Sequence, residues 1–305
     1  MTGPAKAISS EEVDAIFQEV RNWGRWGSDD QCGALNLITP AKRLQASELV
    51  IEGVSVSCAL PLNTVGSGEN PRPVVHLMQN AGDVEGATGS GDYFAIASHG
   101  MAHTHLDALC HIFYRGQMYN GRPASMVTSA GALANSIEAG KDGIVSRGVL
   151  LDIPRSIGKD WLEPGEAIYA EDLEAAEMAM HVRVEEGDIL LVRTGRHVRR
   201  AKAGSAQGLA GIHATALPWL RRRGVAVLGS DGVSDVMPSG MEGGGGLPVH
   251  NIIIPSMGVH LIDNMALDEL EETCDRLDRY EFMLTLAPLK LLRGTASPVN
   301  PIALF

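Results

Sequence analysis

Hydrophobic and polar positions along the chain follow two periods, one typical of buried strands and one typical of helices. Three short apolar runs, bounded by turn residues or helical stretches, predict strands of a mixed sheet at residues 148–153, 189–193 and 225–230. Helices are expected at residues 170–180, 213–223 and 267–280, and a final strand is expected at residues 282–287. Because strands and helices interleave throughout, the pattern predicts an α/β protein.

The part of the chain before these runs has a weaker pattern. Ser9 and Glu12 have the spacing of a capping box, which predicts an amphipathic helix over residues 11–22. β-Branched and apolar residues over 50–62 predict a strand. The Gly/Pro-rich stretch 65–80 predicts a long loop, and loops of that kind often serve as lids over a site.

Strand-like alternation returns at residues 93–109, where it carries a cluster of titratable side chains. Four histidines and an aspartate gather there: His99, His103, His105, Asp107 and His111. The first four positions have the same parity, so one extended strand would project them from one face, and His111 has that parity beyond the end of the expected strand. Imidazole and carboxylate groups bind Zn²⁺ and Mn²⁺, and a histidine that is not a ligand can move a proton. The cluster therefore predicts a divalent metal site.

The same segment resembles the metal-binding signature of the cyclase superfamily, which includes bacterial kynurenine formamidases and isatin hydrolases. That signature is, in outline, H-x-G-T-H-x-D-x-P-x-H, and this sequence matches it at Thr104, His105, Asp107 and His111. Four other stretches are similar to family motifs: WGRWGSDDQCGALN at 23–36, GDILLVRTGR at 187–196, VAVLGSDGVSD at 225–235 and GTASPVNPIAL at 294–304. The combination is much more specific than any single motif.

The resemblance implies a fold, a cofactor and an assembly. The implied fold is α/β, with a mixed, barrel-like β core of the swivelling β/β/α-like kind flanked by helices. It would form a single catalytic domain over 1–305, with an N-terminal helical and loop extension at about 1–48. The implied cofactor is a divalent metal, Zn or Mn, and the implied assembly is a homodimer or homotetramer. A second metal half-site is implied at His250 and Asp263.

Four positions depart from the family motifs: His103 stands at the glycine of the signature and Leu109 at its proline, and two more departures concern metal ligands. Met101 stands where the first histidine of the signature is normally a metal ligand, and Asp263 stands where a glutamate is normal. A thioether is a poor ligand for hard divalent ions. The missing nitrogen is therefore expected from His99 or His103, which have the same parity.

Together these residues predict a hydrolase that cleaves a C–N bond in a small amide, formamide or lactam with a metal-activated water. The expected metal ligands are His105, Asp107, His250, Asp263 and His99. The expected catalytic acid/base groups are His111 and His103. The candidate substrate contacts are Trp26, His76 and His213.

Two alternatives stay open. The departures at Met101 and Asp263 also fit a metal-independent lyase, dehydratase or cyclase of the same fold, in which histidines do acid/base chemistry without an ion. They fit, too, a non-catalytic protein that binds a small molecule and has lost turnover. Binding alone, however, rarely needs so many titratable groups together.

Composition narrows the class of partner. A net charge of −12 argues against nucleic-acid and anionic-membrane partners, which leaves a small-molecule substrate. No apolar run is long enough to span a bilayer, and the four cysteines form no C-x-x-C pair, so we expect a cytoplasmic protein. The glycine run 243–246 fits no phosphate-binding motif, and we expect a flexible loop leading into His250.

Overall fold

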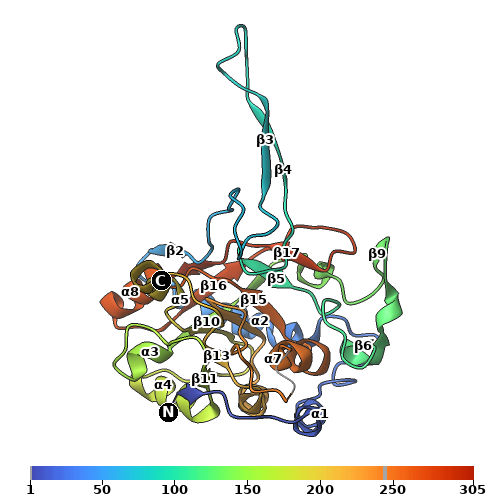
Figure 1. The fold of residues 1–305 in the computed structure, drawn as a ribbon, viewed down its shortest axis with the longest axis vertical. Helices are drawn as coiled ribbons and strands as arrows, with labels where there is room; N and C mark the ends of the chain where they lie inside the picture. Colours follow the sequence, from blue (N-terminus) through green and yellow to red (C-terminus); the bar gives the residue numbers. More distant parts are fainter. Residues whose placement is uncertain (1, 243–245) are drawn as a thin grey trace.

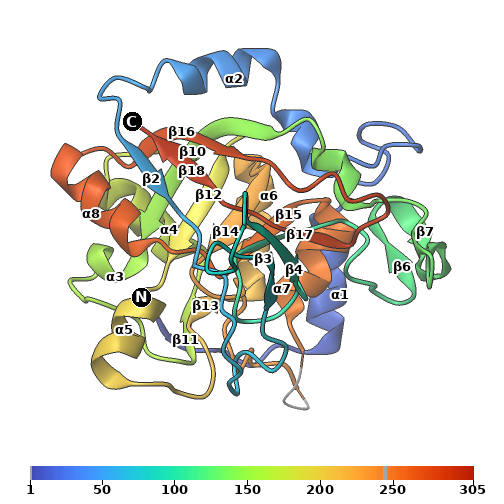
Figure 2. The ribbon, with the colours of Figure 1, turned by 90° about the horizontal axis from the view of Figure 1, so that it is seen from above.

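The centre of the molecule is a mixed sheet of nine strands that curls into half a barrel (Figures 1 and 2). The computed structural model describes residues 2–242 and 246–305, so positions 243–245 of the expected glycine loop lie outside the described residues. Across the sheet the strands are β17 (Ala296–Pro298), β5 (His105–Asp107), β15 (His260–Asp263), β14 (Val227–Ser230), β12 (Ile189–Arg193), β10 (Ile144–Asp152), β16 (Glu281–Leu286), β18 (Ile302–Leu304) and β2 (Ser55–Ser57). The predicted α/β fold with a barrel-like core is confirmed.

The four central strands, β10, β12, β14 and β15, run parallel to one another. Nearly every residue in them is buried, because helices and loops cover both faces of this part of the sheet. Continuous burial explains why three of these strands stand out in the sequence as apolar runs. The antiparallel strands β5 and β17 extend the sheet beyond β15, and they place the histidine cluster at that edge.

Helices flank the sheet (Figure 2). The α-helices are α1 (Ser10–Glu19), α2 (Pro40–Ser47), α3 (Ile153–Ser156), α4 (Ala170–Ala179), α5 (Arg196–Ala203), α6 (Leu217–Arg223), α7 (Pro248–Ile252) and α8 (Asp268–Leu277). The short helical turns are η1 (Gly33–Leu37), η2 (Tyr119–Gly121), η3 (Ala124–Met126), η4 (Ile137–Gly140), η5 (Ala214–Ala216) and the π-helical η6 (Ile253–Met257). The helices expected at 11–22, 170–180 and 267–280 are present as α1, α4 and α8, and Ser9 and Glu12 form the predicted capping box. Within the described residues, no helix combines the length and the apolar character needed to cross a bilayer.

Smaller sheets surround the main one. A three-stranded sheet joins β1 (Gly3–Pro4), β11 (Glu166–Ile168) and β13 (Gly211–Ile212). Three hairpins pair β3 (Val75–Asn80) with β4 (Gly91–Ala95), β6 (Gln117–Met118) with β7 (Arg122–Pro123), and β8 (Val127–Thr128) with β9 (Gly131–Ala132). One hydrophobic cluster contains buried residues from the N-terminal segment through to Phe305, so the N-terminal helices share the core of the main sheet.

Several strand predictions are wrong in their limits. The stretch 65–80 is not all loop, because its last six residues form β3. The strand expected over 93–109 is two strands, β4 and β5, which are separated by an irregular loop at 96–104. Only three residues of 50–62 pair in the sheet, as β2. The strand expected to be last, β16, is followed by β17 and β18.

The hairpin of β3 and β4 projects far from the body of the molecule (Figure 1). It carries exposed apolar side chains, including Leu77, Met78, Tyr93 and Phe94. A two-stranded hairpin has no second layer to cover its faces, so the period-two alternation of this stretch does not correspond to burial. The alternation at 93–95 is therefore that of a strand, but of one that does not belong to the core.

We predict that Gly258→Ala destabilises the protein more than an ordinary glycine substitution. Gly258 links η6 to β15 with a φ of 67°, and a Cβ there would overlap the ring of Tyr119. The left-handed backbone and the overlap together should lower the free energy of unfolding by about 2–5 kcal/mol. The control is Gly53→Ala, which has a φ of 68° with open space around its Cβ position and should lose only about 1–2 kcal/mol. Equal losses in urea unfolding would contradict this account.

Candidate metal centre

The carboxylate of Asp107 lies at the centre of the histidine cluster. Its side chain is 1% exposed. Oδ1 lies 2.9 Å from His99 Nδ1 and 3.5 Å from His105 Nε2. Oδ2 lies 3.8 Å from His250 Nε2 and 4.0 Å from His111 Nε2. Four imidazoles therefore face one buried carboxylate.

The pairing of β5 with β15 brings two carboxylates to the same place. Asp263 of β15 lies directly opposite His105 of β5 in the antiparallel register. Side chains directly opposite each other, and those two residues apart, share a face of the sheet. His105, Asp107 and Asp263 therefore point to one side, and their ligand atoms all lie within 4.8 Å of one another.

His99 reaches Asp107 from the irregular loop before β5, so the expectation that one strand projects His99 together with His105 and Asp107 is wrong. The His99 ring stacks on the ring of His111, with centroids 3.7 Å apart and planes at 14°. Its Nε2 lies 3.0 Å from Thr295 Oγ1. A second set of close ligand atoms is therefore formed by His99, Asp107 and His111. Of the two candidates for the missing nitrogen, His99 is the one that lies beside Asp107.

His103 is placed differently. Its side chain is almost fully buried, and neither ring nitrogen has a hydrogen-bond partner among the described residues. Its backbone carbonyl accepts from His105 Nδ1 at 2.9 Å. This contact fixes the tautomer of His105 and leaves Nε2 free to face Asp107.

The buried carboxylate oxygens fit a cation. In the described part of the chain, Oδ2 of Asp107 and Oδ1 of Asp263 are buried without a hydrogen-bond partner, and the polar neighbours of Asp107 Oδ1 are imidazole nitrogens of His99 and His105. Buried acceptors of this kind normally have a partner, because leaving them unpaired costs free energy. Carboxylate oxygens among imidazole nitrogens make up the ligand set that Zn²⁺ and Mn²⁺ take in proteins. The side chains present therefore fit a divalent ion.

The cluster shifts the pKa values of its members in opposite directions. Burial raises the pKa of Asp107, but His99, His105, His111 and His250 outweigh burial and hold that pKa well below its usual range. Burial lowers the pKa of His111 to about 4, against the pull of Asp107. The His111 ring, whose side chain is 27% exposed, is therefore neutral at pH 7 and can accept a proton.

Asp235 orients His250. Its carboxylate accepts from His250 Nδ1 at 2.6 Å and from the backbone N–H of Val249 at 2.7 Å. With Nδ1 donating to Asp235, Nε2 of His250 points toward Asp263 Oδ2 at 3.3 Å. In the sequence, Asp235 is explained by turn chemistry alone. Nothing in its position along the chain indicates that it accepts a hydrogen bond from His250, because the two residues become neighbours only in the tertiary fold.

A hydrogen-bonded frame holds the loop before β5. Thr104 Oγ1 donates to the carbonyl of Asn264 at 2.6 Å and accepts from the backbone N–H of Leu60 at 2.9 Å. Asn264 Nδ2 donates in turn to the carbonyls of Gly100 and His103, at 2.7 and 3.3 Å. The threonine of the family signature thus ties the histidine loop to the residue that follows Asp263.

Four other residues singled out in the sequence lie apart from the ligand groups. Met101 lines a neighbouring cavity. His76 lies on the projecting hairpin, where its Nε2 is 2.9 Å from Asp92 Oδ2. His213 starts η5 and contacts the carbonyl of Lys6 and the ring of Tyr169. Trp26 packs partly buried under the guanidinium of Arg25. Among the described residues, none of the last three has a hydrogen bond, ion pair or ring contact with the histidine cluster.

Comparisons with known proteins agree on the fold. The protein-family model Cyclase, described as “Putative cyclase”, matches residues 38–235. The crystal structure of a novel cyclase is similar to this chain at 31% identity and a TM-score of 0.85, and the match covers 95% of this chain and 99% of that one. Comparison with curated proteins gives no match.

Two more distant structures share the fold. Isatin hydrolase A from Ralstonia solanacearum is 19% identical, with 87% of this chain and 97% of that chain covered and a TM-score of 0.59. A structure described as a “predicted metal-dependent hydrolase” from Bacillus stearothermophilus is 17% identical, with 82% and 97% covered and a TM-score of 0.53. At these identities the likeness concerns the fold alone.

The contacts of His250 predict an unusual titration in metal-free protein. Burial lowers the pKa of His250, but the carboxylates of Asp263 and Asp235 raise it by more than burial lowers it. The pKa of His250 therefore lies well above its usual value. We expect the imidazole ¹⁵N shifts of chelator-treated protein to show His250 protonated at pH 7. Asp235→Asn removes one negative charge and should lower this pKa, whereas Asp92→Asn on the hairpin should not change it. A neutral His250 at pH 7 in the unmutated protein would contradict the assigned contacts.

Proposed function

Because the chain belongs to the cyclase family, we propose that it is a metal-dependent hydrolase that cleaves a C–N bond in a small amide, formamide or lactam. The hydrolase descriptions of the more distant structures support this class of reaction. The observation that carries the proposal is the set of buried Asp107 and Asp263 oxygens that lack hydrogen bonds and face imidazole nitrogens.

The ligands of the proposed metal are His99, His105, Asp107, His250 and Asp263. His99 takes the place of the nitrogen that Met101 does not supply. When bound, a Zn²⁺ or Mn²⁺ ion supplies Lewis acidity to the substrate carbonyl and to water. Asp235 and the His103 carbonyl hold two of the histidine rings in the orientation that this role needs.

His111 is the proposed proton carrier. Its neutral ring accepts a proton from the attacking water as the new C–O bond forms. It then donates that proton to the leaving nitrogen as the C–N bond breaks, which gives a carboxylic acid and an amine. We assign this role to His111 and not to His103, because the His111 side chain is partly exposed and lies beside the Asp107 carboxylate.

We also propose a cytoplasmic location and an assembly as a homodimer or homotetramer. All four cysteines are free thiols, which suits a reducing compartment. The exposed apolar side chains of the β3–β4 hairpin would be covered in a dimer.

We predict that metal content follows His99 and not His103. Protein purified without chelator should contain about one equivalent of Zn or Mn per chain, because the five assigned ligands include a single shared carboxylate, that of Asp107. His105→Ala and His99→Ala should each lower that content, as measured by elemental analysis. His103→Ala is the matched control and should keep the metal. Loss of metal in His103→Ala with retention in His99→Ala would reverse the ligand assignment.

We predict that His111→Gln separates metal binding from turnover. The metal content should stay at the unmutated level, while kcat on a verified amide substrate should fall by about 10²–10⁴-fold because the proton carrier is missing. Loss of metal together with activity would make His111 a ligand instead. Full activity of His105→Ala would rule out the metal-dependent mechanism altogether.

A further inference from the structure

A cavity beside the histidine cluster holds charged groups that the proposed reaction does not use. Its volume is about 390 Å³, within the range of sites for small molecules. Apolar side chains line part of it: Leu60, Pro61, Leu62, Met101 and Ala102. Arg196, Arg200 and Glu69 line the rest together with His197 and with amide and hydroxyl side chains. Met101 and Ala102 belong to the loop that carries His99 and His103, so the cavity adjoins the candidate metal centre.

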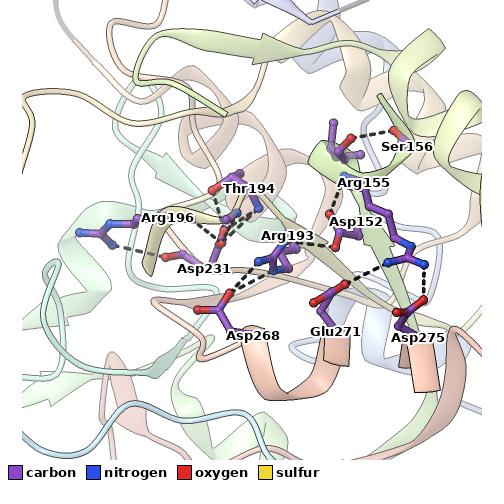
Figure 3. A network of polar contacts seen from close by, with 12 residues as sticks. Asp152, Arg155, Ser156, Arg193, Thr194, Arg196, Asp231, Asp268, Glu271 and Asp275 are labelled. Atoms are coloured by element: carbon purple, nitrogen blue, oxygen red, sulfur yellow. Dashed lines mark hydrogen bonds and ion pairs between the residues drawn. The ribbon is translucent and has the colours of Figure 1, made fainter. Parts of the chain in front are cut away.

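Arg196 is a fixed cation in this cavity. It begins α5, and the backbone N–H groups of Thr194, Gly195 and Arg196 donate to the buried carboxylate of Asp231 at 2.8–3.1 Å (Figure 3). The carboxylate of Asp231 therefore occupies the anion-binding position at the N-terminus of α5. The Arg196 side chain, 11% exposed, donates from Nη1 to Asn264 Oδ1 at 2.9 Å. Asn264 directly follows Asp263, so Arg196 is held one residue from a proposed metal ligand.

Two guanidinium groups and one carboxylate are the charged side chains that line the cavity. Glu69 Oε2 lies 2.7 Å from Arg200 Nη1 but 3.8 Å from Arg196 Nη2, so one carboxylate serves two guanidinium groups. Burial lowers the pKa of Arg196 below its usual value, although Glu69 and Asp231 act in the opposite direction. A buried guanidinium with spare N–H donors is a site for a planar anion, most of all a carboxylate.

We propose that this cavity binds a carboxylate group of the substrate. The proposed hydrolase would then act on amides or lactams that carry a carboxylate besides the bond that is cleaved. Arg196 and Arg200 would bind the anion, and Leu60 and Met101 would contact the apolar part of the molecule. This specificity rests on the proposed function for its reaction, but the binding site can be tested without turnover.

The first test compares benzoate with benzamide, two probes of equal shape that differ in charge. Calorimetry on chelator-treated protein removes the competing interaction of a carboxylate with a metal. We expect benzoate to bind at least about tenfold more tightly than benzamide, because hydrogen bonds to charged groups have free energies that correspond to such a factor. Equal binding of the two probes would overturn the proposal.

Substitutions then locate the site. Arg196→Met and Arg200→Met should each weaken benzoate binding by about tenfold or more and leave benzamide binding unchanged. Arg200 is half exposed and outside the Asp231 network, so its variant tests the site even if Arg196→Met folds poorly. Arg115→Met is the matched control, because that exposed arginine pairs with Asp14 and lies outside this cavity. Unchanged benzoate binding in the Arg200 variant would overturn the proposal.

Glu69→Gln should have the opposite effect on benzoate binding. Removing the internal carboxylate leaves both guanidinium groups without their partner, so benzoate should bind more tightly than in the unmutated protein. Weaker binding would contradict the role of Glu69 as an internal competitor and overturn the proposal. A failure of amide hydrolysis in every assay would defeat the proposed function, yet these binding results would still decide whether the cavity takes a carboxylate.

Discussion

The buried carboxylate of Asp107 is the constraint on which the site depends. A charged group that is 1% exposed is stable only when opposite charges or hydrogen bonds compensate for lost hydration. In this protein both oxygens have imidazole neighbours, and Oδ2 has no hydrogen-bond partner among the described residues. The pairing of β5 with β15 places Asp263 opposite His105 and adds a second carboxylate to the same place. A divalent cation would compensate for both negative charges at once.

Support for this centre comes from segments distant in the sequence. Asp235 orients His250, and the Thr104–Asn264 hydrogen bond ties the histidine loop to the end of β15. Asn264 also accepts from Arg196, so the metal centre and the neighbouring cavity share one hydrogen-bonded frame. A substrate held at Arg196 would therefore have a fixed position relative to the carboxylates of the centre, which is the geometric requirement for rate enhancement by orientation.

The sequence predicted three of the four parallel strands, β10, β12 and β14, because strands covered on both faces are continuous apolar runs, but it did not predict β15. It predicted the histidine cluster through residue type and through the family signature. It did not predict the position of His99, because parity assumes an unbroken strand and the chain between β4 and β5 is irregular. Asp235 and Arg196 were missed as site residues because their partners, His250 and Asn264, become neighbours only through tertiary packing. The hairpin was partly misread as a loop because it buries none of its alternating side chains.

The central claim is that the His–Asp cluster is a divalent metal centre, and anomalous diffraction at the Zn and Mn absorption edges tests it most directly. The account predicts an anomalous peak about 2.0–2.2 Å from an Asp107 oxygen and from a nitrogen of His99 or His105. If crystals grown with Zn²⁺ or Mn²⁺ showed no anomalous peak in the cluster, and ordered waters satisfied the Asp107 oxygens instead, the claim would be contradicted.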